Sequence, residues 1–506
     1  MREPSIRKAS VIVIVFTVAA KLTGFVREAV VAGTFGTSRV VDTYLAAIII
    51  PAIITNVLYQ ALPNAFVPLF AGSERSPSAR RLAVIMLIAS SAISALMWLT
   101  APWTAALTNS GFDAPLRQET VDLVRIGSLA VAIATIEALA RSRLIAQKRF
   151  VQSGFAPAWS SLVIILAVVL FRDAGAHALM WGFVIGTAVV AAWNLLPLRR
   201  SSESFQGDPV QDGSVHDGWI IVVLAVSTIG LLNGLVDRHF GSFLPEGSLA
   251  ALQYADLVAS QPVAILGIAL AGAIFPYLSV SIQSGDQSRV SAILNAAVRW
   301  SLFAVIPIGM LLLLFGVPVV RILFERGEFN AASREMTGAV LSVYGLWMIP
   351  TVLAAMVAKV HYSLRNGRAL LTAMSASIMM KLVVSVLLVD TYGISGLAVG
   401  SALASLTYMV LLTLYLPQWS RAHVGKVWLP LCGALTALAL AGCGVAYAAT
   451  HLPAFPDGKL GAWLSVLLAG GVSTALVMSV GPRMGVSEST KLKEVILNRL
   501  RPAARP

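Results

Sequence analysis

The 506-residue sequence has little charge: Asp, Glu, Lys and Arg make up only 12% of it, roughly half of the share in a typical soluble protein. This shortage excludes an ordinary cytosolic, secreted or disordered chain. There are only two cysteines, Cys432 and Cys443, in one apolar segment. On a helix they would lie about 16 Å apart, too far for a disulfide, so we expect both to serve in packing.

Motifs for nucleotide, metal or hydrolytic chemistry are also missing. The sequence has no GxxxxGK[ST] phosphate loop, no GxSxG and no HExxH, and its six histidines lack metal-ligand spacing. Gly442-Cys443-Gly444 lacks the third glycine of a dinucleotide site. We therefore expect no cofactor, no metal, no ATP drive within the chain and no enzyme activity.

Long apolar runs are what the sequence has instead. Apolar residues make up 57% of the chain and the mean hydropathy is +0.81. At roughly 20–25 residues per span, the length fits about fourteen transmembrane helices, so the sequence predicts an all-α polytopic membrane protein. The expected spans are 9–35, 43–71, 82–108, 120–140, 151–171, 175–198, 218–240, 250–282, 290–324, 333–361, 367–389, 392–417, 427–450 and 460–481.

The excess of 13 positive charges is explained by Lys and Arg in the loops between the predicted spans. If the N-terminus is cytoplasmic and the spans alternate, Lys and Arg gather on the cytoplasmic side, as the positive-inside rule requires. The excess therefore indicates no nucleic-acid partner, and both termini are expected in the cytoplasm. Ala9–Ala20 resembles a signal peptide, but the apolar pattern continues to Phe35, so we expect a retained first helix.

One polar linker, 201–217, divides the chain into two lobes. We expect an N-terminal lobe over 1–200, a C-terminal lobe over 218–417, two further helices within 418–482 and a basic cytoplasmic tail over 483–506. Ala65-Phe66-Val67-Pro68 in the second helix is echoed by Ala273-Ile274-Phe275-Pro276 in the eighth. Parallel repeats of this kind are typical of transporters that bind substrate between two halves.

Charged residues inside spans are costly and therefore mark candidate sites. The first helix carries Lys21, Arg27 and Glu28. Lys21 and Glu28 share a helix face, so they could form an ion pair while Arg27 extends toward the interface. Alternatively, Lys21 and Arg27 both face a water-filled cavity, where two cations would suit a diphosphate.

Other ionisable residues allow similar alternatives. Asp42 opens the second helix and could be either an N-cap or a cavity residue. Asp237, in Asp237-Arg238-His239, belongs either to an interfacial cluster or to a cavity. Asp256 could bind a coupling cation or proton, or could pair locally. Lys359 and Lys381 are expected near span ends, with their side chains extended toward the interface.

Two glycine pairs have the spacing that lets membrane helices approach closely. Gly182 and Gly186 form one pair, and Gly396 and Gly400 form the other. We expect both pairs to serve helix packing rather than substrate binding.

Several strings together resemble a known family. Lys21-Leu-Thr-Gly-Phe-Val-Arg27-Glu28, Asp42-Thr43-Tyr44, Tyr254-Ala255-Asp256 and Leu323-Phe-Glu-Arg-Gly-Glu-Phe329 are similar to motifs of the MurJ/MviN family of lipid II flippases in the MOP superfamily. The matches extend from residue 21 to about residue 400, and the fourteen helices of that family agree with the predicted spans.

The resemblance implies a transporter of the bacterial inner membrane. Such a protein has two pseudo-symmetric six-helix lobes and two C-terminal helices that form a groove for a polyprenyl tail. It moves an undecaprenyl-diphosphate-linked saccharide from the cytoplasmic to the periplasmic leaflet by alternating access, driven by the membrane potential or an ion gradient. Its partners would be this glycan lipid, the bilayer and the cell-envelope synthesis machinery. The resemblance places Lys21, Arg27 and Asp42 on the cavity wall.

The chain also departs from the family pattern. Lysine replaces a usual arginine at Lys21, Asn56 lies where the second helix usually has an arginine, Gln60 lies near a usual glutamate, and Leu257 replaces an arginine. Asn56 and Gln60 remain candidate cavity residues. The departures keep open a flippase for an exopolysaccharide or another envelope glycan, and less directly a MATE-like cation or drug antiporter.

Overall fold

The computed structural model describes residues 6–72, 77–147, 149–200, 219–418, 421, 424–453 and 455–500, and within these ranges it contains helices and no strand. The first six helices are α1 Ile6–Phe35, α2 Arg39–Gly72, α3 Pro77–Thr108, α4 Ala114–Ala146, α5 Phe150–Leu170 and α6 Ala176–Arg200. The later ones are α7 Trp219–Gly241, α8 Ser248–Pro262, α9 Leu270–Gln283, α10 Gln287–Phe324, α11 Ala331–Ser363, α12 Gly367–Leu414, α14 Leu429–Thr450, α15 Gly458–Ser479 and α16 Ser487–Leu500.

The helix pattern confirms the all-α membrane fold. Eleven helices in the described part of the chain are long and apolar enough to cross a membrane. A π-helical turn, Val263–Ala269, joins α8 directly to α9, so these two form one span, as 250–282 predicted. Gly393 (φ 54°, ψ −132°) divides α12 into two helices. The predicted spans 367–389 and 392–417 place a break at the same point. The structure is consistent with about fourteen spans.

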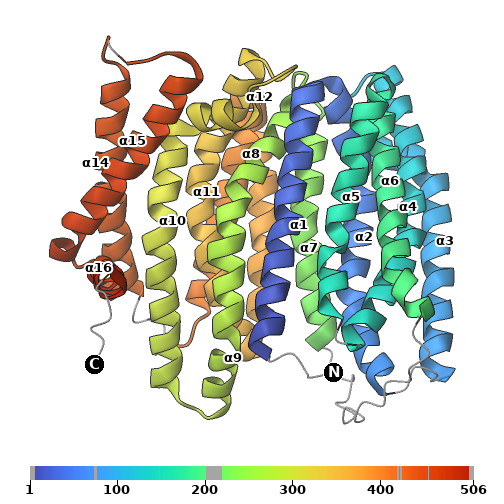
Figure 1. Ribbon diagram of the computed structural model, residues 1–506, viewed down its shortest axis with the longest axis horizontal. Helices are drawn as coiled ribbons and strands as arrows, with labels where there is room; N and C mark the ends of the chain where they lie inside the picture. The colour runs from blue at the N-terminus through green and yellow to red at the C-terminus, as the bar shows by residue number, and fades with distance from the viewer. Residues whose placement is uncertain are drawn as a thin grey trace. The chain divides into compact units, whose positions relative to one another are not determined.

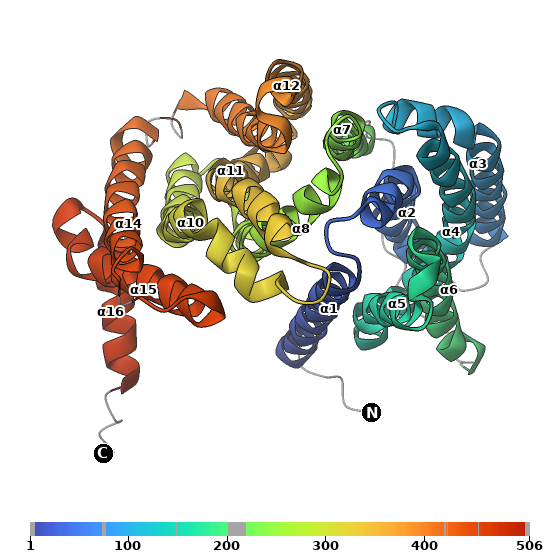
Figure 2. The same ribbon diagram turned by 90° about the horizontal axis from the view of Figure 1, so that it is seen from above.

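The chain forms two compact units. The first comprises the described residues of Met1–Gly218, Gly234–Ala250 and Arg326–Asn330. Within it, α4 is the central helix, since it packs against α2, α3 and α6, while α5 packs against α6 and α1. Figures 1 and 2 show α3 beside α4, with α3 at the outer edge of this unit.

The second unit comprises Trp219–Asn233, Ala251–Glu325 and the described residues of Ala331–Pro506. Its central helix is α10, which packs against α11 and against both α14 and α15. Figure 2 shows α14 and α15 beside α10. The predicted linker 201–217 lies outside the described residues, so the lobe boundaries expected from the sequence remain predictions.

Small residues allow the close helix approaches that the sequence predicted. A methyl group on Gly186 of α6 would lie 2.8 Å from Ser160 Oγ of α5, and one on Gly182 would lie 3.1 Å from Ile164 Cα. A methyl group on Gly400 would lie 3.2 Å from Ser385 Oγ, in the first half of α12. Cys432 and Cys443, both on α14, are free, in agreement with a packing role.

The C-terminal segment is more ordered than a simple basic tail. The guanidinium of Arg299, on α10, binds the carboxylate of Glu488, on α16, through Nε (2.6 Å) and Nη2 (2.9 Å). Nη2 also donates to Ser487 Oγ at 2.9 Å. This two-pronged ion pair fixes the start of α16 to α10, because a planar guanidinium matches a carboxylate geometrically.

The buried ion pair makes the docking of α16 depend on pH. Burial alone would raise the pKa of Glu488, but hydrogen bonds and charge from Arg299, with Lys491 nearby, outweigh it, so the pKa lies below its ordinary value. A lowered pKa stabilises the folded state above the ordinary value of about 4.3. That stabilisation is lost as the pH falls through the lowered pKa.

We therefore predict that Glu488→Gln loosens α16 at neutral pH by about 1.5–3 kcal/mol, the usual range for a hydrogen bond to a charged group. Hydrogen–deuterium exchange of the α16 amides should be faster in the variant at neutral pH and should converge with wild type in acid. Equal exchange at neutral pH would show that this ion pair does not hold the helix.

Candidate functional site

The two predicted cations of α1 differ in their surroundings. Arg27 binds its neighbour Glu28 through Nε and Nη2, and its side chain is 31% exposed. Lys21 is exposed and makes no ion pair or hydrogen bond with any residue that the structure describes. Glu28 thus pairs with Arg27 rather than with Lys21, so the alternative of a Lys21–Glu28 pair is wrong.

The pairing leaves Arg27 able to bind a second anion. A guanidinium has five N–H donors, and Glu28 accepts from two of them, so three make no hydrogen bond with a described residue. The phenol of Tyr44, on α2, lies close enough to Arg27 to interact with its charge. Glu28 therefore orients Arg27 without using all of its donors.

Asp42 has a role that the sequence did not predict. It lies in the first turn of α2 and is buried, with 5% of its surface exposed. Its Oδ2 accepts from the backbone N–H of Gly247 at 2.7 Å, and its Oδ1 accepts from that of Ala250 at 2.8 Å. The carboxylate therefore caps the start of α8, not of its own helix, and the expected N-cap role on the second helix is wrong.

The local sequence explains why α8 needs a cap from elsewhere. A helix start leaves backbone N–H groups without partners, and a side chain at the preceding residue usually accepts from them. In α8 that residue is Gly247, which has no side chain and a φ of 86°. A Cβ there would lie 2.5 Å from the carbonyl oxygen of Thr37, so glycine is required and Asp42 supplies the missing acceptor.

The remaining predicted residues are not gathered into one described cluster. Asn56 is exposed on α2, and Gln60 lies on the same helix at a position whose side chain is outside the described residues. Asp237 is partly buried near the end of α7, in the first unit, and Asp256 is partly buried on α8, in the second. Their expected cavity and coupling roles remain predictions.

Two lysines were expected to extend from span ends. Lys359 lies near the end of α11 with its ammonium over the rings of Phe275 (5.2 Å) and Tyr362 (5.6 Å), and its extension toward the interface stays a prediction. Lys381 is buried, with 2% exposed, and its Nζ donates to the carbonyl of Asn233 on α7 at 2.9 Å. The expectation for Lys381 is therefore wrong, because its ammonium is enclosed and bonds to α7 instead of extending toward an interface.

The first unit also contains a buried polar group that is not among the sequence predictions. Glu137 of α4 is 4% exposed and Asn194 of α6 is fully buried, and Asn194 Nδ2 donates to Glu137 Oε1 at 3.0 Å. One turn later, Arg141 lies over the ring of Tyr59, 3.7 Å from its centre. A glutamate inside the predicted span 120–140 was the signal that could have identified this group.

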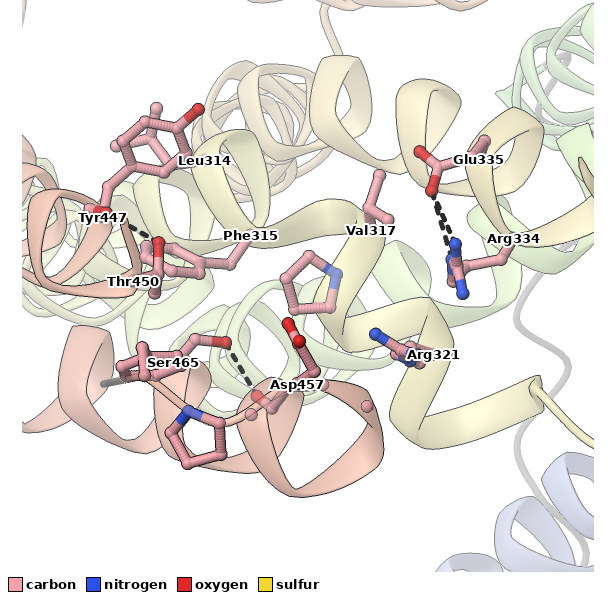
Figure 3. Close-up of a pocket in the computed structure, with 16 residues that line it drawn as sticks. Leu314, Phe315, Val317, Arg321, Arg334, Glu335, Tyr447, Thr450, Asp457 and Ser465 are labelled. Atoms are coloured by element: carbon pink, nitrogen blue, oxygen red, sulfur yellow. Dashed lines mark hydrogen bonds and ion pairs between the residues drawn. The ribbon is translucent and has the colours of Figure 1, made fainter. Parts of the chain in front are cut away.

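A pocket of about 410 Å³ lies in the second unit where α10, α11, α14 and α15 meet (Figure 3). Arg334 forms ion pairs with Glu325 (Nη1 to Oε2, 3.0 Å) and Glu335 (Nη2 to Oε1, 3.0 Å), and Arg321 Nε lies 3.1 Å from Glu325 Oε2. In Figure 3, Arg321 and Asp457 lie on facing sides of the pocket. Its apolar wall includes Leu314, Phe315, Val317, Pro318, Phe455 and Ala462. The guanidinium groups are already paired with carboxylates, which leaves little net charge to attract an anion.

The described residues offer no metal centre, since no group of three or more His, Cys, Asp or Glu side chains among them could hold an ion. Among the predicted site residues, the first unit contains the two cations of α1, Lys21 and Arg27, and the carboxylate of Asp42 that caps α8. Of these, the cations of α1 have the chemistry to bind a phosphate-bearing ligand.

We predict that Asp42→Ala destabilises the purified protein by about 1–2 kcal/mol, the usual cost of a lost helix cap. Asp42→Asn keeps one acceptor and should lose less. Asp113→Ala, which removes the exposed cap of α4 at Leu116 N, is the matched control and should cost no more than the Asn variant. Thermal unfolding without substrate tests this, and an Asp42→Ala protein as stable as wild type would exclude the capping role.

Comparison with known proteins identifies the family. The sequence model of the family described as "Lipid II flippase MurJ" matches residues 31–456. A probable lipid II flippase MurJ of Rhizobium meliloti (strain 1021) is 26% identical over 468 residues, which cover 87% of this chain and 86% of that protein. A lipid II flippase MurJ of Burkholderia cenocepacia is 25% identical over 375 residues, which cover 69% and 71%.

Solved structures show the same fold. A lipid II flippase MurJ in an inward closed conformation superimposes with a TM-score of 0.75 at 19% identity, covering 94% of this chain and all of that one. An inward-facing multidrug resistance MATE transporter of the MOP superfamily gives a TM-score of 0.60 at 13% identity, covering 82% and 98%. With the family match over most of its length, this chain belongs to the lipid II flippase MurJ family of multi-pass membrane transport proteins.

Proposed function

We propose that this protein moves lipid II, an undecaprenyl-diphosphate-linked peptidoglycan precursor, from the cytoplasmic to the periplasmic leaflet of the bacterial inner membrane. The observation that carries the proposal is the family match over residues 31–456. The names of the curated relatives point to the same substrate. No comparison favours an exopolysaccharide unit, and the likeness to a MATE transporter concerns the fold alone.

The diphosphate of the substrate would be bound by the cations of α1. Arg27 has three N–H donors that no described residue uses and is held in place by Glu28. Lys21 is exposed and adds a second positive charge. A lysine binds phosphate as a point charge, without the two-pronged geometry of an arginine. Arg27 would therefore orient the diphosphate, and Lys21 would contribute attraction.

The proposed cycle alternates access to the two leaflets. Moving an anionic headgroup outward is favoured by an inside-negative membrane potential, at about 2.3 kcal/mol per charge per 100 mV. Return of the empty, positively charged site inward is favoured by the same potential. The bound anion would thus reverse the direction in which the potential acts on the site, with no need for ATP.

Topology follows from the loop charges. Lys and Arg gather in the loops on one side of the predicted spans, and these loops are cytoplasmic by the positive-inside rule. Both termini would then lie in the cytoplasm. A link to the cell-envelope synthesis machinery is proposed because the flipped precursor must be consumed on the outer face.

We predict that Arg27→Ala reduces transport by at least about a hundredfold, since loss of a hydrogen-bonded ion pair to substrate costs about 3 kcal/mol or more. Arg27→Lys should retain part of the activity. The measurement is rescue of growth in a strain depleted of its own lipid II flippase, with membrane levels of each variant determined in parallel.

Arg125→Ala is the matched control, because Arg125 is also an arginine of the first unit, is 33% exposed and pairs with a nearby acid, Asp122. It should rescue growth as wild type does. Full rescue by Arg27→Ala at normal membrane levels would exclude Arg27 from the substrate site.

A further inference from the structure

Glu137 is a carboxyl group enclosed in the first unit, away from the cations of α1 that the proposed function uses. It lies on α4, the central helix of that unit, and contacts Asn194 on α6. Both side chains are almost completely buried, at 4% and 0% exposed. A carboxylate in such surroundings is costly unless its charge is compensated or a proton neutralises it.

The hydrogen bonds of the pair are incomplete in a specific way. Asn194 Nδ2 donates to Glu137 Oε1 at 3.0 Å, while Asn194 Oδ1 is buried and accepts from no described residue. An ionised carboxylate is an acceptor only and cannot satisfy that oxygen. A proton on Glu137 would give the pair the donor that it lacks.

The opposite orientation of the amide leads to the same conclusion. If the nitrogen and oxygen of Asn194 were exchanged, two oxygens would lie 3.0 Å apart, within hydrogen-bond distance only if a proton lies between them. In the orientation that the structure shows, an ionised Glu137 accepts from Nδ2 but leaves Asn194 Oδ1 without a donor among the described residues. In the exchanged orientation, an ionised Glu137 cannot make the contact. A protonated Glu137 supplies a donor to the pair in both cases.

Few charged groups near Glu137 oppose its protonated, neutral form. Arg141, one turn further along α4, is the cation that acts on Glu137 among the described residues. Its guanidinium lies over the Tyr59 ring, from α2, and donates to the Tyr59 carbonyl at 3.2 Å. Helix α2 contributes one titratable group, the phenol of Tyr59, and α6 contributes the neutral Asn194. Among the described residues, neither α3 nor α5 provides a charged partner of Glu137.

We propose that Glu137 and Asn194 form a proton-binding site in which the Glu137 carboxyl group is held in its neutral form as an acid–amide pair. The proton binds when α4 and α6 enclose the pair and leaves when water reaches it. Proton exchange thus reports on the packing of these two helices. The site is independent of substrate identity, so its test does not depend on lipid II transport.

Infrared difference spectroscopy of the purified protein in lipid is the direct test. Wild type at neutral pH should show the carbonyl band of a protonated carboxyl group, and Glu137→Gln should remove that band while the protein stays folded. Glu119→Gln, on the same helix, is the matched control and should keep the band. A wild-type band that persists in Glu137→Gln, or no such band in wild type, would overturn the proposal.

A second variant covers the case in which Glu137→Gln does not fold. Glu137→Asp keeps a carboxyl group at the same position and should fold. We expect its protonated-carboxyl band to be present but at a shifted frequency, because the shorter side chain changes the hydrogen bond to Asn194. A band that stays at the wild-type frequency in Glu137→Asp would belong to another residue and would overturn the proposal.

Discussion

Charge inside an apolar helix bundle is costly unless a partner compensates it, and this constraint accounts for the contacts of several charged side chains in the described helices. Arg27 is held by Glu28, and Asp42 by two backbone N–H groups at the start of α8. The ammonium of Lys381 donates to a main-chain carbonyl. Each contact replaces hydration that the membrane interior does not supply.

The same constraint separates charges with a structural role from charges available to a ligand. Both oxygens of Asp42 are used by α8, so its carboxylate is an anchor for that helix. Arg27 keeps donors that no described residue uses, and Lys21 is exposed. In the first unit, positive charge is therefore left available on α1, which is the arrangement that a diphosphate-bearing lipid requires.

The apolar pattern of the sequence was enough to predict the spans, because span length is set by membrane thickness. It even located the break at Gly393, where the apolar run pauses. The partners of Asp42 and Lys381 could not be predicted, because they are backbone groups of helices distant in sequence. The anchoring of α16 depends on Arg299, nearly two hundred residues away, and a lone glutamate such as Glu137 shows its importance only beside Asn194.

The central claim is that the protein flips lipid II, and transport by the purified protein in liposomes tests it most directly. Lipid II and an undecaprenyl-diphosphate-linked exopolysaccharide unit are placed in separate vesicles under an imposed membrane potential. Their appearance in the opposite leaflet is then followed over time. We expect rapid, potential-dependent movement of lipid II and little movement of the other lipid. Transport of the exopolysaccharide unit alone, with lipid II stationary, would contradict the account.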